Sequence, residues 1–208
     1  MRMGGAGRSA AEILRDEDEA TIADILFHFG EERASRRIAR AIVADRETRP
    51  LTSTLELAGL IARVAPARRG ELTHPATRAF QALRIAVNDE LGELVRGLCA
   101  AECLVKPGGR VVVVTFHSLE DRIVKQFLAS RSGRGRATSR RLPGEPAEAE
   151  PTFEVPRGQP IEPREAETHA NPRARSAKLR FGVRLSAPPR ARDEAIEALA
   201  RLPARRGR

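Results

Sequence analysis

A dense group of polar side chains follows a run of β-branched residues near the middle of the chain. The run covers residues 111–115, and His117, Ser118, Glu120 and Asp121 come directly after it. A continuous run of this kind is typical of a strand that is covered on both faces. Ligands of open α/β sheets bind beyond the carboxyl ends of the strands. We therefore predict that these four side chains shape a functional pocket.

The same cluster also has a purely structural interpretation. Ser118 and Asp121 stand three residues apart, which is the spacing of a capping box at the start of a helix. An imidazole in the position of His117 could simply hydrogen-bond a neighbouring loop. Taken by itself, the cluster leaves both interpretations open.

A basic row marks a second candidate site, on a helix that Pro75 is suited to open. Arg78 and Arg84 recur there at helical spacing, and His74 stands just before the helix. A helix N-terminus and a row of guanidinium groups can hold phosphate. We predict RNA contacts at these three residues, and the alternative is a solvated charged face.

A third candidate segment, residues 171–180, carries four cations in ten positions next to a predicted strand. Asn171, Arg173 and Arg175 belong to this segment, and such groups position a protein on a nucleic-acid backbone. We predict that these three residues contact RNA. The alternative is a generic basic loop.

Helical periodicity dominates the first 70 residues of the chain. Gly30 is placed to end one of these helices, and Pro66 closes another. Ser53 and Glu56 form a capping-box pattern at the start of the helix that Pro66 closes. The segment is therefore predicted to be a helical subdomain, assigned to residues 1–72.

The rest of the chain mixes helix and strand. A helical pattern covers residues 76–104, with a break expected near Asn88, and a Pro-Gly-Gly turn at 107–109 leads into the run at 111–115. Residues 178–185 form a second candidate strand. This order of elements indicates an α/β fold, with the run at 111–115 expected at the centre of the sheet. Because two strands do not make a doubly wound sheet, either the sheet is small or its first strands lie on other sequence.

Composition separates two further segments. Residues 131–170 are rich in Pro, Gly, Arg and Glu and poor in aliphatic side chains, so we predict a flexible loop there. Residues 187–208 form a basic tail with a short helical pattern at 193–202. The net charge of +9 and the pI near 11.0 favour a polyanionic partner. No apolar run of about 18 residues and no signal region is present, so we expect a cytoplasmic protein without a membrane span.

The residue types also limit the chemistry. Cys99 and Cys103 are the only cysteines, which is too few for a four-ligand zinc site without other ligands. We expect no metal and interpret the pair as reduced, buried thiols on one face of a helix. Trp and Tyr are absent, so an RNA surface built on stacked aromatic rings is not expected.

Several segments together resemble a known family. Residues 30–33 leading into 37–39, residues 74–90, residues 107–125 and residues 171–180 are similar to the ribosomal RNA small subunit methyltransferase H family. The resemblance implies methylation of the exocyclic 4-amino group of a cytosine in 16S ribosomal RNA, with S-adenosyl-L-methionine as methyl donor. It also implies a Rossmann-like class I methyltransferase domain with a helical insertion. The partner would be 16S ribosomal RNA or the small ribosomal subunit.

The chain departs from the family pattern in one respect. The Gly-rich loop, the acidic residue for the donor's ribose and the Asp-Leu-Gly segment of the family are not found in this sequence. We therefore expect the helical insertion at 1–72 and the C-terminal part of the methyltransferase domain at 73–186, with no cofactor-binding residue in this chain. The chain is expected to be inactive alone.

Two rival interpretations remain open at this point. One is a non-catalytic RNA-binding remnant of the same family, which would bind RNA in a salt-sensitive way without binding the donor. The other is a small basic helical protein with an unrelated binding role, which would show no preference for ribosomal RNA. Both fit the net charge of +9 as well as an enzyme does.

Overall fold

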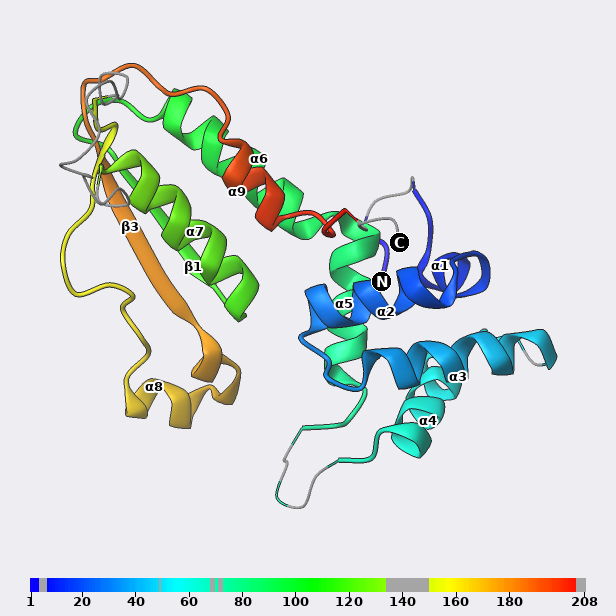
Figure 1. Ribbon diagram of the computed structural model, residues 1–208. Coiled ribbons are helices and arrows are strands. Elements are labelled where there is room, and N and C mark those ends of the chain that lie inside the picture. The colour runs from blue at the N-terminus through cyan, green and yellow to red at the C-terminus, as the bar shows by residue number, and fades with distance from the viewer. Residues whose placement is uncertain (4–6, 49, 68–69, 71–72, 134–149, 205–208) are drawn as a thin grey trace, which may run out of the picture. The chain divides into compact units, whose positions relative to one another are not determined.

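The computed structural model describes residues 1–3, 7–48, 50–67, 70, 73–133 and 150–204. These residues form two compact units (Figure 1). The first unit is Met1–Glu90 together with the residues from Leu202 onward, and the second is Leu91–Arg201. The first unit extends past the boundary expected near residue 72, because α5 (Thr77–Asn88) packs against α2 (Glu19–Gly30).

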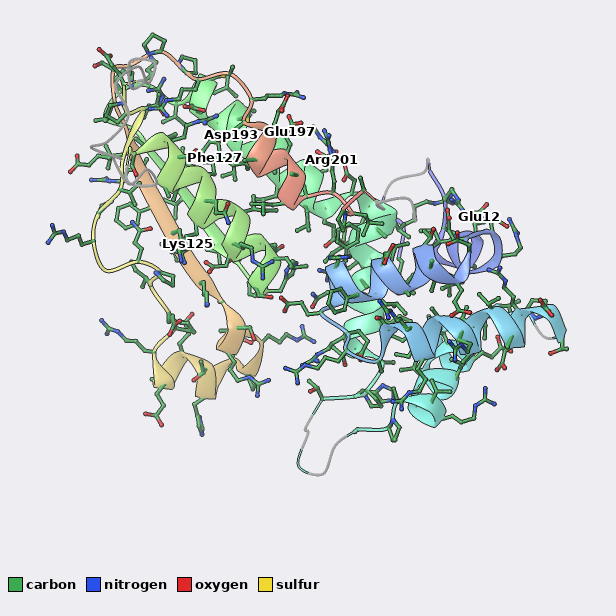
Figure 2. All side chains as sticks on the ribbon, in the orientation of Figure 1. Glu12, Lys125, Phe127, Asp193, Glu197 and Arg201 are labelled. Atoms are coloured by element: carbon green, nitrogen blue, oxygen red, sulfur yellow. The ribbon has the colours of Figure 1, made fainter. Side chains whose placement is uncertain are left out.

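The first unit is helical, as predicted. Its helices are α1 (Ala10–Asp16), α2, α3 (Ser35–Thr48), α4 (Thr54–Val64) and α5. Three of these helices, α1, α2 and α4, begin at side-chain caps. Ser9 and Glu12, the latter labelled in Figure 2, form a capping box at α1. The predicted box of Ser53 and Glu56 at α4 is confirmed. Each box satisfies backbone N–H groups that the first turn of a helix leaves without partners.

The core of the first unit lies between α2 and its neighbours α3 and α5. Its largest fully buried side chains are Ile22, Leu26, Ile38, Ile42, Ile61, Leu83 and Ile85. α2 does end at Gly30, but the left-handed residue that follows it is Glu31. A Cβ on Gly30 would lie 2.6 Å from the carbonyl oxygen of Arg78. Gly30 is therefore needed for the close packing of α2 against α5.

The second unit contains an antiparallel three-stranded sheet. Its elements are α6 (Glu90–Leu104), β1 (Arg110–Thr115), α7 (Ser118–Arg131), β2 (Phe153–Glu154), α8 (Glu165–Ala170), the 3-10 helix η1 (Pro172–Ser176), β3 (Lys178–Arg184) and α9 (Glu194–Leu199). β3 lies between β1 and β2. The predicted α/β class, the strand near 178–185 and the break after Asn88 are all confirmed, the break falling at the left-handed Asp89.

β1 is an edge strand of this sheet, not its centre, so the prediction for residues 111–115 is wrong on this point. Val111 and Thr115 are buried on the face that α7 covers. Val112 and Val114 point to the other face and are 55% and 50% exposed. The prediction failed because an apolar run shows which side chains favour burial but not whether a neighbouring layer is there to bury them.

The segment predicted as one long flexible loop is ordered at both ends. Arg131, Thr152 and Phe153 are buried, and the ring centroids of Phe153 and Phe127 lie 6.2 Å apart. Figure 2 labels Phe127 on α7. Residues 150–170 also contain β2 and α8, so the loop prediction is wrong for this part. Composition alone missed it, because a few well-placed apolar residues suffice to anchor a polar segment. Residues 134–149 lie outside the described residues.

Two smaller observations complete the fold. Cys99 and Cys103 are both free, but Cys103 is exposed and Cys99 only half-buried, so the expectation of two buried thiols is wrong. Partial burial raises the pKa of the Cys99 thiol above its ordinary value. Within the described parts of the chain, no helix is long and apolar enough to cross a membrane.

Candidate functional site

The polar side chains after β1 hold the start of α7. His117 is the N-cap residue, and its Nδ1 accepts a hydrogen bond from the backbone N–H of Glu120 (3.4 Å). Glu120 Oε2 accepts from the backbone N–H groups of Phe116 (2.9 Å) and His117 (3.3 Å). The predicted capping pair of Ser118 and Asp121 is therefore wrong. α7 begins at Ser118, so the box falls one residue earlier, on His117 and Glu120.

His117 and Glu120 also approach each other through their outer atoms. His117 Nε2 lies 3.4 Å from Glu120 Oε1, and this contact is an ion pair only when the imidazole is protonated. Ser118 is exposed at the first position of the helix. The end of β1 thus presents an imidazole, a carboxylate and a hydroxyl within one helical turn, which are groups that can hydrogen-bond a polar ligand and move protons.

Asp121 has a different environment from the other three candidates. It is buried, and both of its carboxylate oxygens accept hydrogen bonds from Arg180 of β3, at 2.7 and 3.0 Å. Lys178 Nζ lies 3.8 Å from the same carboxylate. The hydrogen bonds from Arg180, followed by the nearby positive charges, hold the pKa of Asp121 below its usual value. Asp121 therefore stays ionised near neutral pH and joins α7 to β3.

The basic row on α5 is partly engaged in packing. Arg78 Nη1 donates to the backbone carbonyl of Glu31 at 3.5 Å, and Arg84 forms an ion pair of 2.8 Å with Glu90. Gln81, in the same row, donates to the carbonyl of Phe29 at 3.2 Å. His74 is exposed, and its Nδ1 accepts from the backbone N–H of Ala76. These contacts fix the end of α2 and the start of α5 and leave His74 and Arg78 at the surface.

The second basic segment is less engaged. Asn171 caps η1 by accepting from the backbone N–H of Arg173 at 3.2 Å. Arg173 and Arg175 are exposed, and neither side chain has a hydrogen bond or ion pair to the residues that the structure describes. Two guanidinium groups, from residues two positions apart in the sequence, therefore remain available to an anion. This segment belongs to the second unit, whereas His74, Arg78 and Arg84 belong to the first.

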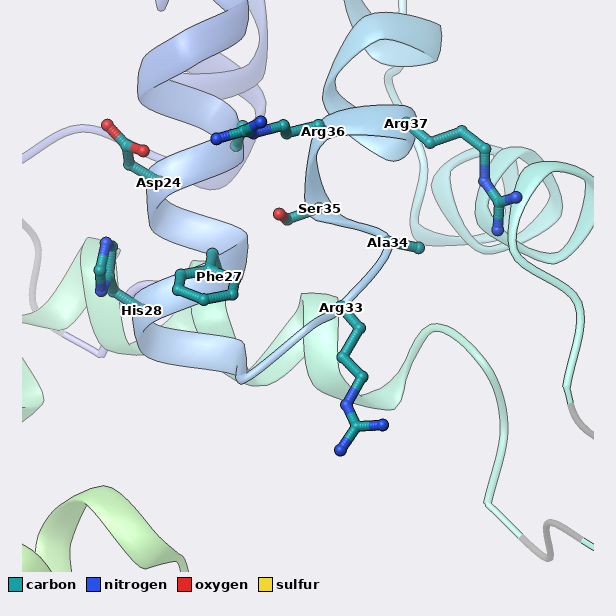
Figure 3. Close-up of a pocket in the computed structure, with 9 residues that line it drawn as sticks. Asp24, Phe27, His28, Arg33, Ala34, Ser35, Arg36 and Arg37 are labelled. Carbon is teal, nitrogen blue, oxygen red and sulfur yellow. The ribbon is translucent and has the colours of Figure 1, made fainter.

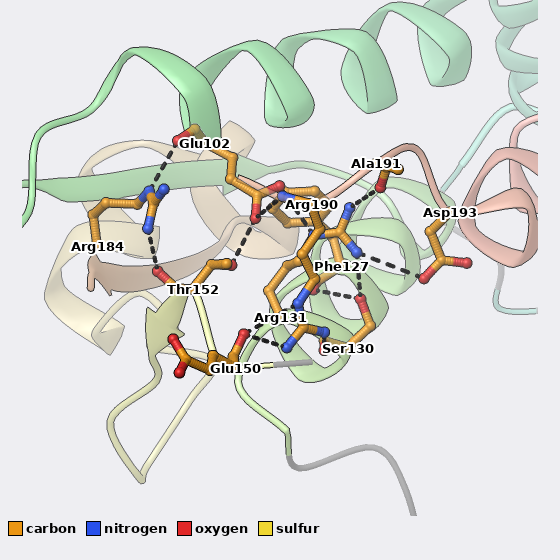
Figure 4. A network of polar contacts seen from close by, with 10 residues as sticks. All are labelled: Glu102, Phe127, Ser130, Arg131, Glu150, Thr152, Arg184, Arg190, Ala191 and Asp193. Carbon is orange, nitrogen blue, oxygen red and sulfur yellow. Dashed lines mark hydrogen bonds and ion pairs between the residues drawn. The ribbon is translucent and has the colours of Figure 1, made fainter. Parts of the chain in front are cut away.

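The sequence analysis missed a buried polar network in the second unit (Figure 4). Glu102 is 1% exposed, and its two oxygens accept from Arg131 Nε (3.0 Å) and from the Thr152 hydroxyl (2.6 Å). Arg184 donates to the backbone carbonyls of Glu102 (2.9 Å) and Thr152 (3.2 Å). The backbone N–H of Arg190 lies 3.4 Å from Glu102 Oε1. One carboxylate thus ties together α6, the end of α7, the residues before β2 and the start of the tail.

Two signals in the sequence could have indicated this network. Glu102 falls four residues after Leu98, in line with the apolar stripe of α6, where a lone carboxylate needs a partner. In β3, the alternate residues Arg180, Gly182 and Arg184 are the buried ones. Two arginines among three buried positions are unusual on the covered face of a strand, and here each arginine is hydrogen-bonded.

Comparison with known proteins gives a consistent result along the chain. Residues 1–184 match the model of the MraW methylase family. A protein of Methylocella silvestris named ribosomal RNA small subunit methyltransferase H is 66% identical over 205 residues, which are 99% of this chain and 59% of the relative. Proteins of the same name from Beijerinckia indica and Caulobacter vibrioides are 64% and 57% identical, over 98% and 90% of the chain.

The relatives are longer than this chain. The aligned part makes up 57% of the Beijerinckia indica protein and 60% of the Caulobacter vibrioides protein, so the chain spans about six-tenths of the length of the relatives it matches. The family match nevertheless includes most of both compact units, from Met1 to the last residue of β3. The chain therefore belongs to the MraW methylase family.

Proposed function

We propose that this chain takes part in methylation of the exocyclic 4-amino group of a cytosine in small-subunit ribosomal RNA, in the cytoplasm. The observation that carries the proposal is the family match over residues 1–184, together with the name shared by the relatives. The net charge of +9 supports a polyanionic substrate. The partner would be 16S ribosomal RNA or the small ribosomal subunit.

The reaction makes two demands on the protein. The lone pair of the cytosine amino group is delocalised into the ring, so the base must be held in a fixed orientation for methyl transfer. The base must also leave any stack to enter a pocket. We propose that His117, Ser118 and Glu120 contact the base at the end of β1, with Glu120 fixed by the capping box. Asp121 then acts as a positioning residue through its pair with Arg180.

S-adenosyl-L-methionine is the donor expected for the family, and the residues at the end of β1 do not fit it. A donor site needs acceptors for the ribose hydroxyls and the ammonium group. At this end of the sheet, Arg180 engages both oxygens of Asp121, and backbone N–H groups engage Oε2 of Glu120. A single carboxylate oxygen would therefore have to serve all of these groups. We therefore assign no residue of this chain to the donor and derive no step through it.

For RNA binding, we propose that each of the two units makes its own contacts with the RNA. The helical unit would contact the RNA through His74, Arg78 and Arg84. Asn171, Arg173 and Arg175 would hold its backbone from the second unit. The exposed, unpaired state of Arg173 and Arg175 supports this role for the second group.

The RNA part of the proposal can be tested on the 208-residue chain. Binding to a fragment of small-subunit RNA should weaken steeply with salt, and Arg173→Ala with Arg175→Ala should flatten the slope by about one unit per lost contact. Arg15→Ala with Arg201→Ala is the matched control, because it removes the same charge from exposed arginines that are paired with acids. Equal salt-dependence slopes for the two double variants would show that Arg173 and Arg175 do not contact the RNA backbone.

The catalytic part can be tested on a longer form, in which this chain is joined to the part of the Methylocella silvestris relative that lies outside the match. With labelled donor and small ribosomal subunits, that form should produce N4-methylcytidine in the digested RNA. A methyl group on any other atom would contradict the proposed reaction. The non-catalytic RNA-binding interpretation is correct instead under two conditions. The 208-residue chain binds RNA in a salt-sensitive way, and calorimetry shows no heat of donor binding for this chain or for the longer form.

A further inference from the structure

A pocket of about 710 Å³ lies between α2 and α3 in the helical unit (Figure 3). None of the candidate residues discussed above lines it. Its lining consists of Ala23, Asp24, Phe27, His28, Arg33, Ala34, Ser35, Arg36 and Arg37. The pocket therefore combines an aromatic side, contributed by α2, with a basic side, contributed by the segment that leads into α3.

The first turn of α3 offers unused hydrogen-bond donors to this pocket. The N–H groups of a first helical turn have no partners within the helix. The backbone N–H of Ser35 donates to the carbonyl of Glu32, and the N–H of Ala34 donates to the Glu32 carboxylate. The N–H groups of Arg36 and Arg37 form no hydrogen bond within the described residues. The first turn also carries no acidic residue. This end of the helix can therefore receive an anion.

Ser35 is an independent sign of a ligand. The residue is 4% exposed, yet its hydroxyl has no hydrogen-bond partner among the residues that the structure describes. Figure 3 shows the hydroxyl turned toward α2 and into the space beside Phe27. A hydroxyl that faces a pocket from an otherwise buried residue, and that has no protein partner, is placed to bond a ligand there. An oxygen of a bound anion would provide such a partner.

The cations of the pocket are free to bind such an anion. Arg33 and Arg36 are exposed and have no hydrogen bond or ion pair within the described part of the chain. By contrast, Arg40 of the same helix lies 3.6 Å from Glu19, and Arg46 donates to backbone carbonyls. In Figure 3, Arg36 extends from α3 in the direction of α2. The Asp24 side chain is the one acidic group in the lining.

The aromatic side completes the pocket. Phe27 is 53% exposed although it lies on a helix whose other large apolar residues are buried. The ring of His28 meets it edge-on, with centroids 5.0 Å apart, and leaves a face of Phe27 open. Proteins that bind single-stranded nucleic acids combine exposed aromatic rings with cations in this way. A base stacks on the ring, and the cations contact the phosphate backbone.

We propose that this pocket binds one nucleotide of single-stranded RNA. The phosphate lies at the start of α3, held by the Ser35 hydroxyl, the first-turn N–H groups and the guanidinium of Arg36, with Arg33 beside it. The adjoining base stacks on Phe27. The inference rests on the proposed RNA substrate and adds a contact point that is separate from the cluster after β1 and from residues 171–175.

The test compares two neighbouring arginines. In Figure 3, the side chain of Arg36 reaches toward α2. Arg37 also lines the pocket, but its side chain points to the opposite side of α3. Arg36→Ala and Arg37→Ala remove the same charge and keep the backbone N–H groups. Fluorescence anisotropy of the 208-residue chain with a labelled single-stranded RNA of twelve nucleotides should show about tenfold weaker binding for Arg36→Ala, from the loss of a charge-assisted bond. Arg37→Ala should lose much less.

Two more variants separate phosphate from base. Ser35→Ala should weaken RNA and an abasic strand of the same length alike. Phe27→Leu should weaken RNA by about fivefold or more but leave the abasic strand unaffected, because base–aromatic stacking is lost. Thermal unfolding of each variant must match the parent chain, which it should for Arg36→Ala because that side chain is exposed.

The possible outcomes are distinguishable. Equal losses for Arg36→Ala and Arg37→Ala would mean that only general charge matters, and would overturn the pocket. If Arg173→Ala with Arg175→Ala weakens binding while Arg36→Ala and Phe27→Leu do not, the proposed RNA function stands and this inference fails. If the parent chain binds no RNA, both fail. Equal binding of single-stranded DNA and RNA would support the phosphate site but show that the pocket does not select RNA over DNA.

Discussion

Arg180 of β3 and Asp121 of α7 form a two-point ion pair, with Nε–Oδ1 and Nη2–Oδ2 distances of 2.7 and 3.0 Å. The two side chains are only 10% and 11% exposed. Planar guanidinium and carboxylate groups meet in this way with two parallel hydrogen bonds, which fixes their relative orientation. The pair therefore sets the position of the first turn of α7 over the sheet, and with it the position of His117 and Glu120.

Removing one partner should be costly for stability. Asp121→Asn leaves Arg180 buried without a counter-charge, and breaking a buried pair costs about 3–5 kcal/mol in the free energy of unfolding. Urea unfolding measures this change. Asp16→Asn is the control, because Asp16 pairs with Arg15 at the surface and its side chain is 45% exposed; its loss should stay below about 1 kcal/mol. Similar losses for both variants would show that the Arg180–Asp121 pair is not a structural anchor.

The same pair predicts a pH dependence. Hydrogen bonds from Arg180 lower the folded-state pKa of Asp121 below its ordinary value of 3.8. A group with a lowered folded-state pKa stabilises the protein above its unfolded-state pKa, and that contribution is lost as the pH falls through the folded-state pKa. The stability difference between the parent chain and Asp121→Asn should thus be greatest above about pH 5 and shrink below about pH 4. A difference that stays constant down to about pH 2 would contradict the assignment.

The Glu102 network should be equally sensitive. Glu102→Ala leaves Arg131 buried and removes the acceptor of the Thr152 hydroxyl, so we expect a loss of about 3–5 kcal/mol in the free energy of unfolding. Glu93→Ala is a control in the same helix, since Glu93 is 69% exposed in its pair with Arg96. A double-mutant cycle with Arg131→Met should show a coupling energy well above about 0.5 kcal/mol. Additive effects would mean that the two side chains act independently.

Two helical glycines predict changes of opposite sign. Gly30→Ala would place a Cβ 2.6 Å from the backbone oxygen of Arg78, and we expect a loss of about 1–3 kcal/mol as α2 and α5 move apart. Gly59 in α4 has open space around its position, so Gly59→Ala should gain about 0.5–1 kcal/mol from helix propensity. Thermal unfolding of the two single variants decides this, and a shift in the same direction for both would argue against the close contact.

The open face of the sheet predicts a change in association. Val112 and Val114 are exposed beside Leu179 and Phe181 in the register of β1 and β3. An apolar face next to a free strand edge favours association. Val112→Lys with Val114→Lys should therefore reduce light scattering at high concentration, at a cost of only about 1 kcal/mol in stability. Val111→Lys, on the covered face, should instead unfold the second unit; equal costs would mean that both faces are covered.

The sequence predicted most helices and strands correctly because their signals are local. The break after Asn88, the capping box of Ser53 and Glu56 and the strand near residue 180 all depend on neighbours within a few positions. It was less informative about what each element packs against. The apolar run of β1 has the same sequence pattern whether the second face of the strand is covered or open. The position of β1 at the edge of the sheet therefore could not be predicted.

The candidate site shows the same limit. The polar cluster after β1 was located correctly as a group, but not the partner of each member. Asp121 pairs with Arg180, which is 59 residues away along the chain, and the capping box is formed by His117 and Glu120 instead. The pocket of Phe27 and Ser35 was not predicted, because it depends on how α2 faces α3. Whether these residues bind RNA stays a prediction.

The Glu102 network also has a consequence during translation. The backbone N–H of Arg190, which approaches the Glu102 carboxylate, is made 88 residues later. At ribosomal rates this takes on the order of ten seconds. Arg131 and Thr152 are made earlier, but until Arg190 follows the carboxylate lacks its last donor, and the network is incomplete. Helices α1 to α5, whose partners lie within the first 90 residues, are free to fold during that interval.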